Sequence, residues 1–313
     1  MGICKIFIFV IRGGECQLEE VITYITTLEI NDNVQLAFRG EKEDYGDDKL
    51  VPSIYRTKTN YLKNEEIIYR EMQRFNDNEF IDDRTTFDKL SRMQHYSAPT
   101  RLLDISEDLM SAIYFAIANK EDDKKDAILY IFEIDKKKIK YYDSDAVSVV
   151  SNLVKIPLDN SSQKSKRSIL CDRKKYLSSK KTFNKQNSIK FLRHEIREEK
   201  PQFEAIIKAK DITSILCVRP KLTSNRLKAQ KGFFLLFGLN PEDVEKPIKL
   251  IQKNKKLIDS KLVNHPIRKV HKLVLESLNI EDMKVTLNKM GITQPFIYPE
   301  MDKVAENLKQ RFN

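Results

Sequence analysis

Residues 94–104 concentrate hydrogen-bonding and ionisable side chains around a proline, in the order Gln-His-Tyr-Ser-Ala-Pro-Thr-Arg-Leu-Leu-Asp. Pro99 fixes its own φ and disfavours helical geometry at Ala98, so the polar residues on either side are held on a bend. The apolar run that begins at Ala112 is typical of a helix and would anchor this bend. Polar groups held against a hydrophobic support are what a binding or catalytic site requires, and we therefore expect a site here.

Arg39 and His95 are the first candidates for chemistry. Arg39 ends a short predicted strand just before Gly40, whose missing side chain would let a ligand approach the backbone. A guanidinium at that point suits bidentate capture of phosphate or carboxylate, and the alternative is an ion pair with Glu41 or Asp104. His95 is one of four histidines and is suited to general acid/base work or to ligand binding, with a purely structural histidine as the alternative.

Five further residues are candidates for the same site. Arg101 and Asp104 stand three apart, and we expect Arg101 to face a ligand with Asp104 as its orienting partner, unless both belong to a buried structural network. Thr100 is either a helix N-cap or a phosphate-directed hydroxyl. Gln230 is suited to an amide-bearing or ribose-bearing ligand. Arg56 either joins these residues or lies on the surface.

Polar blocks that are far apart in the sequence but flanked by core-type runs are best explained by a shared site. We therefore predict that Arg39, His95, Arg101 and Gln230 line one concave pocket.

The order of several short blocks resembles the FRG-domain family, which is named for Phe38-Arg39-Gly40. The blocks that carry the resemblance lie at residues 38–40, 50–56, 94–104, 112–116 and 230–233, with weaker ones at 278–280 and 297–300. Two positions depart from the family pattern: Ser97 stands where the family usually has Gly, and Ile105 where it usually has Trp. Neither change alters the polar residues. The resemblance implies a prokaryotic antiphage or abortive-infection setting.

The aromatic-Arg-Gly end of the first predicted strand also looks like the first motif of arginine-type ADP-ribosyltransferases. In those enzymes the Arg holds the phosphates of NAD, a Ser/Thr segment supports the nicotinamide ribose, and a late glutamate stabilises the oxocarbenium-like transition state. Arg39 and Thr100 fit the first two roles. The third has no match, because this chain has Gln230-Lys231-Gly232 where those enzymes have Gln/Glu-x-Glu. The likeness is at the level of the fold alone.

The first functional hypothesis is therefore an antiphage effector or toxin that acts on NAD or another nucleotide. Its catalytic residues would be Arg39, His95, Arg101 and Asp104, and its ligand-binding residues Arg39, Thr100 and Gln230.

Two alternatives stay open. In a nuclease or nucleic-acid-directed toxin, His95 would act as acid and base while Arg39 and Arg101 stabilise the phosphorane charge. No paired acids accompany His95 at metal-ligand spacing, so we predict no metal site. The other alternative is a non-enzymatic sensor of a phosphorylated ligand or a phage protein.

The elements that must position these residues alternate between helix and strand, which predicts an α+β fold with a central mixed or antiparallel sheet flanked by helices. We expect helices at 19–28, 64–75, 87–94, 108–119, 242–250, 270–277 and 302–311. We expect strands at 6–11, 35–39, 127–134, 205–207, 215–218 and 233–237.

Residues 161–200 hold 13 Lys and Arg against 4 Asp and Glu, which is +9 of the chain's formal +10. We interpret this segment as an exposed basic insertion, and residues 164–200 as a candidate surface for nucleotides or nucleic acid; a solvated lysine-rich surface is the alternative. The expected organisation is a first FRG part at 1–160, the insertion at 161–200, closing strands at 201–240 and a helical C-terminal part at 241–313.

The longest apolar run, residues 6–11, is too short to cross a bilayer, so we expect no membrane partner. The four cysteines lie far apart without a Cys-x-x-Cys pair, which favours a reducing, cytoplasmic location without a thiolate zinc site.

Overall fold

Eight strands form one mixed sheet in the part of the chain that the computed structural model describes. That part comprises residues 5–10, 17–56, 59–118, 124–159, 164–204, 206–239 and 265–301, with 304, 305, 307 and 309. The strands are β1 (Lys5–Val10), β2 (Val34–Glu41), β3 (Leu102–Ser106), β4 (Ala127–Asp135), β5 (Lys140–Tyr141), β6 (Ile215–Arg219), β7 (Gly232–Phe237) and β8 (Ile267–Leu275). Their order is β1-β8-β4-β2-β3-β7-β6-β5, parallel at β1/β8 and β5/β6 and antiparallel elsewhere. The predicted α+β class is confirmed.

The sheet divides into two halves at its centre. β2 and β3 pair at one position, Phe38 with Ser106, whereas β2 pairs with β4, and β3 with β7, along their whole lengths. Side chains from both halves, among them Tyr130 of β4 and Phe233 of β7, pack into one inner cluster. The segment between β2 and the next helix adds Leu50 and other apolar side chains to this cluster, so it covers the inner face of both halves.

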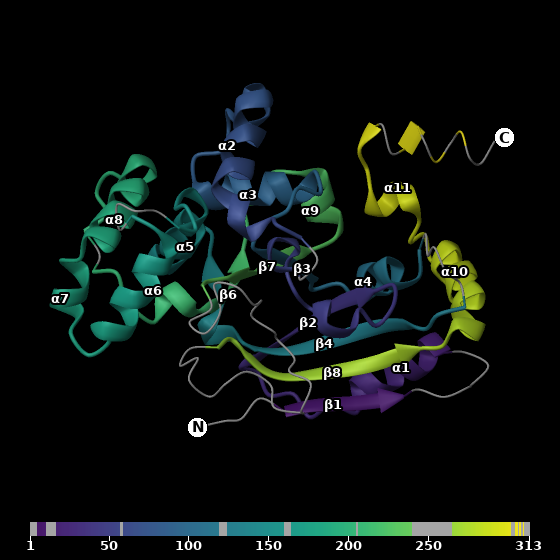
Figure 1. Ribbon diagram of the computed structural model, residues 1–313. Coiled ribbons are helices and arrows are strands. Elements are labelled where there is room, and N and C mark those ends of the chain that lie inside the picture. The colour runs from purple at the N-terminus through teal and green to yellow at the C-terminus, as the bar shows by residue number, and fades with distance from the viewer. Residues whose placement is uncertain are drawn as a thin grey trace.

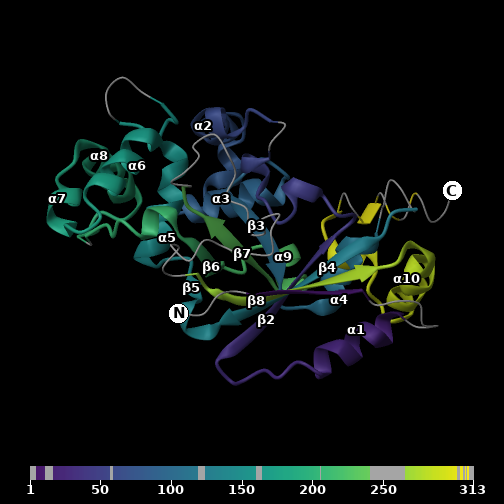
Figure 2. The same ribbon diagram turned by 60° about the horizontal axis from the view of Figure 1, so that its bottom comes forward.

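Helices cover the outer face of each half (Figures 1 and 2). The half that contains β2, β4 and β8 is covered by α1 (Gln17–Thr26), α4 (Leu109–Ile117) and α10 (Ile280–Lys289). The half that contains β3, β7 and β6 is covered by α2 (Glu65–Phe75), α3 (Thr86–His95), α5 (Asp145–Ser151), α6 (Lys166–Lys175), α7 (Lys180–Asn184) and α8 (Asn187–Glu199). Two short helices, α9 (Asn225–Ala229) and α11 (Gln294–Ile297), lie beside each other near the sheet centre.

Helix α3, which delivers residues 94–104 to their bend, has a well-defined beginning and end. Thr85 is its N-cap, and a capping box joins Thr85 with Asp88. At its other end Ser97 has a φ of 60°, in the left-handed region. The bend after α3 is therefore set by local backbone geometry as well as by Pro99.

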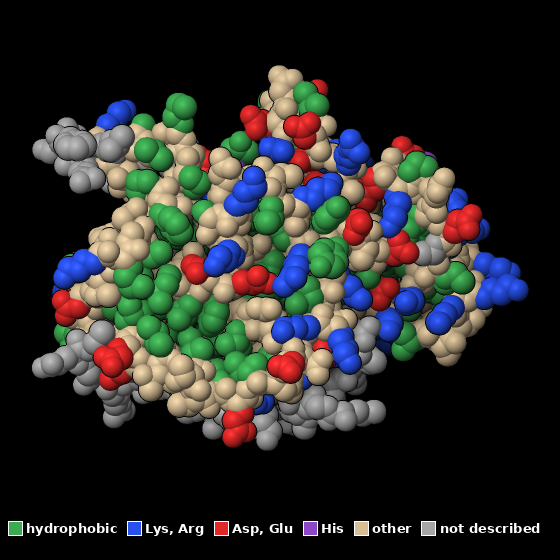
Figure 3. Space-filling model, turned by 180° about the vertical axis from the view of Figure 1, so that it is seen from behind, with side chains coloured by type: hydrophobic (Ala, Val, Ile, Leu, Met, Phe, Trp, Pro, Cys, Tyr) green, Lys and Arg blue, Asp and Glu red, His purple; other side chains and the backbone are tan. Residues whose placement is uncertain are grey.

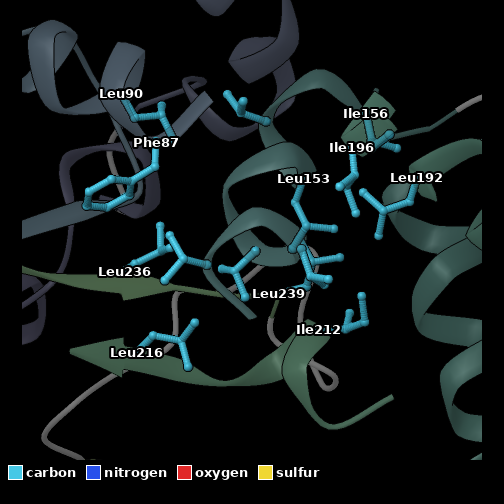
Figure 4. Close-up of a cluster of buried hydrophobic side chains, with 14 of the residues drawn as sticks. Phe87, Leu90, Leu153, Ile156, Leu192, Ile196, Ile212, Leu216, Leu236 and Leu239 are labelled. Carbon is cyan, nitrogen blue, oxygen red and sulfur yellow. The ribbon is translucent and has the colours of Figure 1, made fainter. Parts of the chain in front are cut away.

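The described part of the basic segment, residues 164–200, is folded and packs on the rest of the molecule, although many of its lysines are exposed. It forms α6, α7 and α8, and Figure 3 shows basic side chains on the molecular surface with acidic ones between them. The inner sides of these helices are apolar, and Leu192 and Ile196 of α8 pack against Leu153 and Ile156 (Figure 4). The apolar face of these helices was overlooked because lysines dominate the composition of the segment. An apolar residue at every third or fourth position is enough to form a packed helical face.

The C-terminal part is not wholly helical, because residues 267–275 form β8 between β1 and β4. A helix was predicted at 270–277, and this prediction is wrong. Within β8, Val270 packs in the inner cluster, whereas Leu273 and Leu275 pack on the outer face beneath the helices. Because both faces of this strand are covered, its apolar residues do not alternate with polar ones as in a half-exposed strand. The β4/β8 ladder is also irregular, since Glu133 pairs with Lys269 but Ile134 with Ile267.

One smaller expectation is also corrected. Residues 206 and 207 belong to no strand, although one was predicted at 205–207. In α2, Ile67 and Phe75 are exposed, and the helix buries Glu65 and Tyr69. The other expected helices and strands are confirmed within a few residues, except that the helix predicted at 242–250 and most of the one at 302–311 lie outside the described residues. Among the described residues, none of the helices is long and apolar enough to cross a membrane.

Candidate functional site

A pocket of about 270 Å³ lies where the two halves of the sheet separate. Beyond the pair Phe38 and Ser106, the facing edges of β2 and β3 have no further ladder pairing. Arg39 reaches across this gap, and its Nη1 donates a hydrogen bond of 2.8 Å to the main-chain oxygen of Asp104. Arg39 and Asp104 are thus neighbours in one pocket. Gln230 lines the same pocket, as the sequence predicted for Arg39 and Gln230.

The pocket combines cationic, acidic and aromatic side chains. Its basic residues are Arg39, Lys42, Arg56 and Arg226, and its acidic residues are Glu41 and Asp104. Its aromatic residues are Phe38, Tyr45, Phe115, Phe233, Phe234 and Tyr298. Guanidinium groups bind phosphate in a bidentate manner, and aromatic rings stack on planar heterocycles, so this lining is suited to a nucleotide.

Glu41 holds the guanidinium of Arg39 in place. Its Oε1 accepts a hydrogen bond of 3.1 Å from Nε of Arg39 and one of 3.2 Å from the main-chain nitrogen of Leu50. Glu41 is only 4% exposed, and its Oε2 is buried without a hydrogen-bond partner among the described residues. Because Glu41 is buried and Asp104 accepts through its main chain, Arg39 presents a guanidinium of fixed direction to the pocket. The ion pair with Glu41 that the sequence left open is present, and it orients Arg39 without removing it from the pocket.

Asp104 is the exposed carboxylate of the pocket. Its Oδ2 accepts a hydrogen bond of 2.5 Å from Nε2 of Gln94, whose Oε1 in turn accepts one of 2.6 Å from the hydroxyl of Thr100. Thr100 is 1% exposed, and its hydroxyl also accepts from the main-chain nitrogen of Leu102. Thr100 is therefore neither a helix cap nor exposed to a ligand. It fixes Gln94, and Gln94 fixes Asp104.

Gln230 lines the pocket, but its amide is engaged by the chain's C-terminal part. Its Nε2 donates a hydrogen bond of 3.0 Å to the main-chain oxygen of Ile297. Its own main-chain oxygen accepts from the hydroxyl of Ser106. The residue that follows, Lys231, has a φ of 44°, so the tight entry into β7 occurs there and not at Gly232.

His95 does not line this pocket, which corrects the predicted grouping. It lies at a neighbouring hollow of about 60 Å³, and its Nε2 is 2.6 Å from Oε1 of Glu300. The sequence placed His95 correctly at the end of a helix before the bend. It could not show that the side chain turns toward a residue 205 positions further along the chain.

Arg101 is fully buried and does not reach the pocket. Its Nε and Nη2 donate hydrogen bonds of 2.9 and 2.5 Å to the two carboxylate oxygens of Glu65, and its Nη1 donates to the main-chain oxygen of Phe237. Lys166 of α6 completes the group, 2.9 Å from Glu65. The expected pair of Arg101 with Asp104 is therefore replaced by a buried network between α2, α6 and the start of β3.

The buried network lowers the pKa of both Glu65 and Lys166, but for different reasons. Burial alone would raise the pKa of Glu65, but the charges of Arg101 and Lys166 outweigh it and hold that pKa below its ordinary value. Burial lowers the pKa of Lys166, and the nearby charge of Glu65 opposes this only in part. The network contains two cationic side chains, Arg101 and Lys166, and one carboxylate, Glu65. Without Glu65 both buried cations would lack a counter-charge.

Gly40 serves the fold and not a ligand. A Cβ at this position would lie 2.0 Å from the main-chain oxygen of Ala112 and 2.6 Å from the main-chain nitrogen of Ala116. Helix α4 therefore packs directly on the backbone of β2. The glycine of Phe38-Arg39-Gly40 allows this approach, and the approach places Phe115 of α4 on the pocket wall.

Sequence reasoning foresaw Glu41 as a partner of Arg39 but missed the roles of Gln94, Arg226 and Tyr298. Gln94 begins the block at 94–104 and Tyr298 lies in the weaker block at 297–300, so their position was a usable signal. Arg226 carries no local signal, because only the pairing of α9 with α11 brings it to the pocket. Within the described residues, no group of three or more His, Cys, Asp or Glu side chains could hold a metal ion.

Residues 34–125 match the family model of the FRG domain. The match includes the blocks at 38–40, 50–56, 94–104 and 112–116, so this region of the chain is an FRG domain. The blocks at 230–233, 278–280 and 297–300 lie outside it. No curated protein and no solved structure matches the chain.

Proposed function

We propose that this FRG-domain protein is an antiphage effector that binds NAD or a related nucleotide in the pocket and breaks the bond between ribose and base. The observation that carries the proposal is the placement of Arg39 and Asp104 side by side, one a fixed guanidinium and the other an exposed carboxylate, among further arginines and aromatic rings. The likeness of the Phe-Arg-Gly strand end to ADP-ribosyltransferases supports NAD as the first ligand to test.

In this proposal the arginines bind the phosphates. Arg39 is held by Glu41, and Arg56 lines the same pocket, so a diphosphate would meet two guanidinium groups. Their net positive charge suits an anionic ligand. Positioning the diphosphate fixes the attached ribose, which contributes to rate by orienting the reacting bond.

Asp104 supplies the negative charge that the reaction needs. When the glycosidic C–N bond breaks, nicotinamide leaves with the bonding electron pair and positive charge develops on the ribosyl carbon. A carboxylate held beside that carbon stabilises the charge. Water or an acceptor nucleophile then forms the new bond to the ribosyl carbon and gives its proton to Asp104 or to solvent. Gln94 keeps the carboxylate in one orientation during these steps.

The test is incubation of the purified protein with labelled NAD and mixed nucleic acid, with and without host extract. We expect release of nicotinamide, with ADP-ribose either free or attached to a component of the extract. Asp104→Asn and Arg39→Lys should each lower the rate by at least about 100-fold. The matched controls are Asp32→Asn and Arg74→Ala, which change exposed residues that do not line the pocket.

Other outcomes would replace the proposal. Tight binding of a nucleotide without turnover would make the protein a sensor, and metal-independent strand cleavage would make it a nuclease. In cells, Asp104→Asn should abolish phage protection or growth arrest while soluble expression stays unchanged. Protection that survives this substitution would remove Asp104 from the mechanism.

A further inference from the structure

One wall of the pocket comes from the C-terminal part of the chain, far outside the matched family region. Tyr298 follows α11 directly and lines the pocket together with Phe115 of α4 and Arg226 of α9. Figure 1 shows α11 above α4 and beside α9. Three elements that are distant in sequence therefore meet here. This wall is not built by the strands that carry Arg39 and Asp104.

The side chains of this wall are mutually oriented. The rings of Phe115 and Tyr298 meet edge to face, with their centroids 6.1 Å apart. The guanidinium carbon of Arg226 lies over the ring of Tyr298, 4.7 Å from its centroid. An aromatic ring flanked by a guanidinium is a surface on which planar heterocycles stack, with a contribution of about 1–3 kcal/mol per base.

Two contacts fasten the C-terminal segment on either side of Tyr298. Before it, the main-chain oxygen of Ile297 accepts the hydrogen bond from Gln230. After it, Glu300 contacts His95. The main-chain oxygen of His95 also accepts a hydrogen bond of 3.2 Å from Nη1 of Arg226, so His95 is tied to both Arg226 and Glu300. His95 belongs to the support of the wall.

We infer that the wall formed by Phe115, Arg226 and Tyr298 binds the planar ring of the ligand, and that His95 is a positioning residue that holds this wall through Glu300. The inference rests on the proposed function, since it gives a binding surface to the ring of a nucleotide whose phosphates bind at Arg39. It divides the pocket into two subsites. The FRG motif binds the diphosphate, and the C-terminal segment selects ligands that carry a base.

The experiment compares two probes that contain no nicotinamide–ribose bond, ADP and inorganic pyrophosphate, by calorimetric or fluorescence titration. Tyr298→Ala should weaken ADP binding by roughly 5- to 150-fold and leave pyrophosphate binding unchanged. Tyr298→Phe keeps the ring and should retain the affinity for ADP. Phe296→Ala is the matched control, because Phe296 lies in the same segment, is 44% exposed and does not line the pocket.

The role of His95 is tested with the same two probes. His95→Ala should reduce the preference for ADP over pyrophosphate, and His95→Gln, which retains a hydrogen-bond donor for Glu300, should restore most of it. A general loss of folding would instead lower the affinity for both probes together. Circular dichroism of each variant separates the two effects.

The failure of this inference is distinguishable from the failure of the proposed function. If Arg39→Ala leaves the binding of both probes unchanged, the proposed function is wrong. If Arg39→Ala weakens both probes but Tyr298→Ala weakens both equally or neither, the phosphate site stands and the ring subsite is overturned.

Discussion

Ser97 stands where the FRG family usually has glycine, and the backbone explains the family's preference. The main-chain nitrogen of Ala98 donates to the oxygen of Met93, and that of Ser97 to the oxygen of Gln94, each at 3.0 Å. This pair of bonds is the Schellman ending of a helix, in which one residue takes the left-handed conformation. Ser97 takes it with a φ of 60°, where a Cβ costs roughly 1–2 kcal/mol.

Ser97→Gly should therefore stabilise the protein. We expect the free energy of unfolding to rise by about 0.5–1 kcal/mol, because relief of the strain exceeds the extra entropy of an unfolded glycine. Ser97 is exposed, so its packing contributes little. Urea denaturation measures the effect, with Ser97→Ala as the control that keeps the Cβ. If the Gly variant is no more stable than the Ala variant, the turn is not strained.

At this same scale, the sequence located the pocket better than it assigned the roles within it. Arg39, Asp104 and Gln230 were found because they stand in the short polar blocks that carry the FRG resemblance. The roles of Arg101 and His95 were not, because burial and a distant partner decide them. Arg101 pairs with Glu65, 36 residues earlier, and a motif shows residue types without showing which side of a strand is covered.

At the scale of elements, the packing of α4 on β2 depends on Gly40. Gly40→Ala should cost about 3 kcal/mol or more of folding free energy, since the new Cβ would collide with backbone atoms of Ala112 and Ala116 that cannot move independently. The expected signs are a lower midpoint in thermal unfolding and a disturbed pocket. Gly232→Ala is the control, because Gly232 lines the same pocket but a Cβ there meets only Leu227 at 3.4 Å. Equal stability of the two variants would contradict this role of Gly40.

The buried network between α2 and α6 gives a second prediction at this scale. Glu65→Gln should destabilise the protein by about 3–5 kcal/mol, because it leaves Arg101 and Lys166 buried together without a counter-charge. Glu66→Gln is the matched control one residue along the same helix. Its ion pair with Arg70 lies at the surface, where a change of about 0–1 kcal/mol is expected.

The network should also show in acid unfolding. The pKa of Glu65 is held below its ordinary value of 4.5, so its contribution to stability is complete above that pH and is lost as the pH falls through the lowered folded pKa. Stability measured against pH should therefore fall in this acidic range for the natural protein and for Glu66→Gln. In Glu65→Gln this part of the pH dependence should be absent. A profile that keeps it would place the titrating group elsewhere.

For the whole molecule, the alternation of helix and strand predicted the class of the fold but not its division into two half-sheets. The local pattern predicted β2 at 35–39 but not β3. Their single pairing at Phe38 and Ser106 depends on how the two halves pack around the inner cluster, which involves residues from 37 to 270. The same limit applies to β8, whose apolar residues pack on both covered faces of the sheet.

The last prediction concerns the exposed lysines of the basic segment. Lys166 is buried and structural, so the binding of polyanions at residues 164–200 must depend on the exposed lysines, which include Lys174, Lys175, Lys180, Lys181, Lys185 and Lys190. Replacing these six by Gln should flatten the slope of log affinity against log salt by roughly 0.7–0.9 for each phosphate group that the variant no longer neutralises.

The control for this experiment replaces Lys136, Lys137 and Lys138, a basic run outside the segment, and should leave the slope unchanged. Activity on a small nucleotide should persist in both variants, since none of these lysines lines the pocket. An unchanged slope in the six-fold variant would show that α6–α8 carry their charge only as a solvated surface.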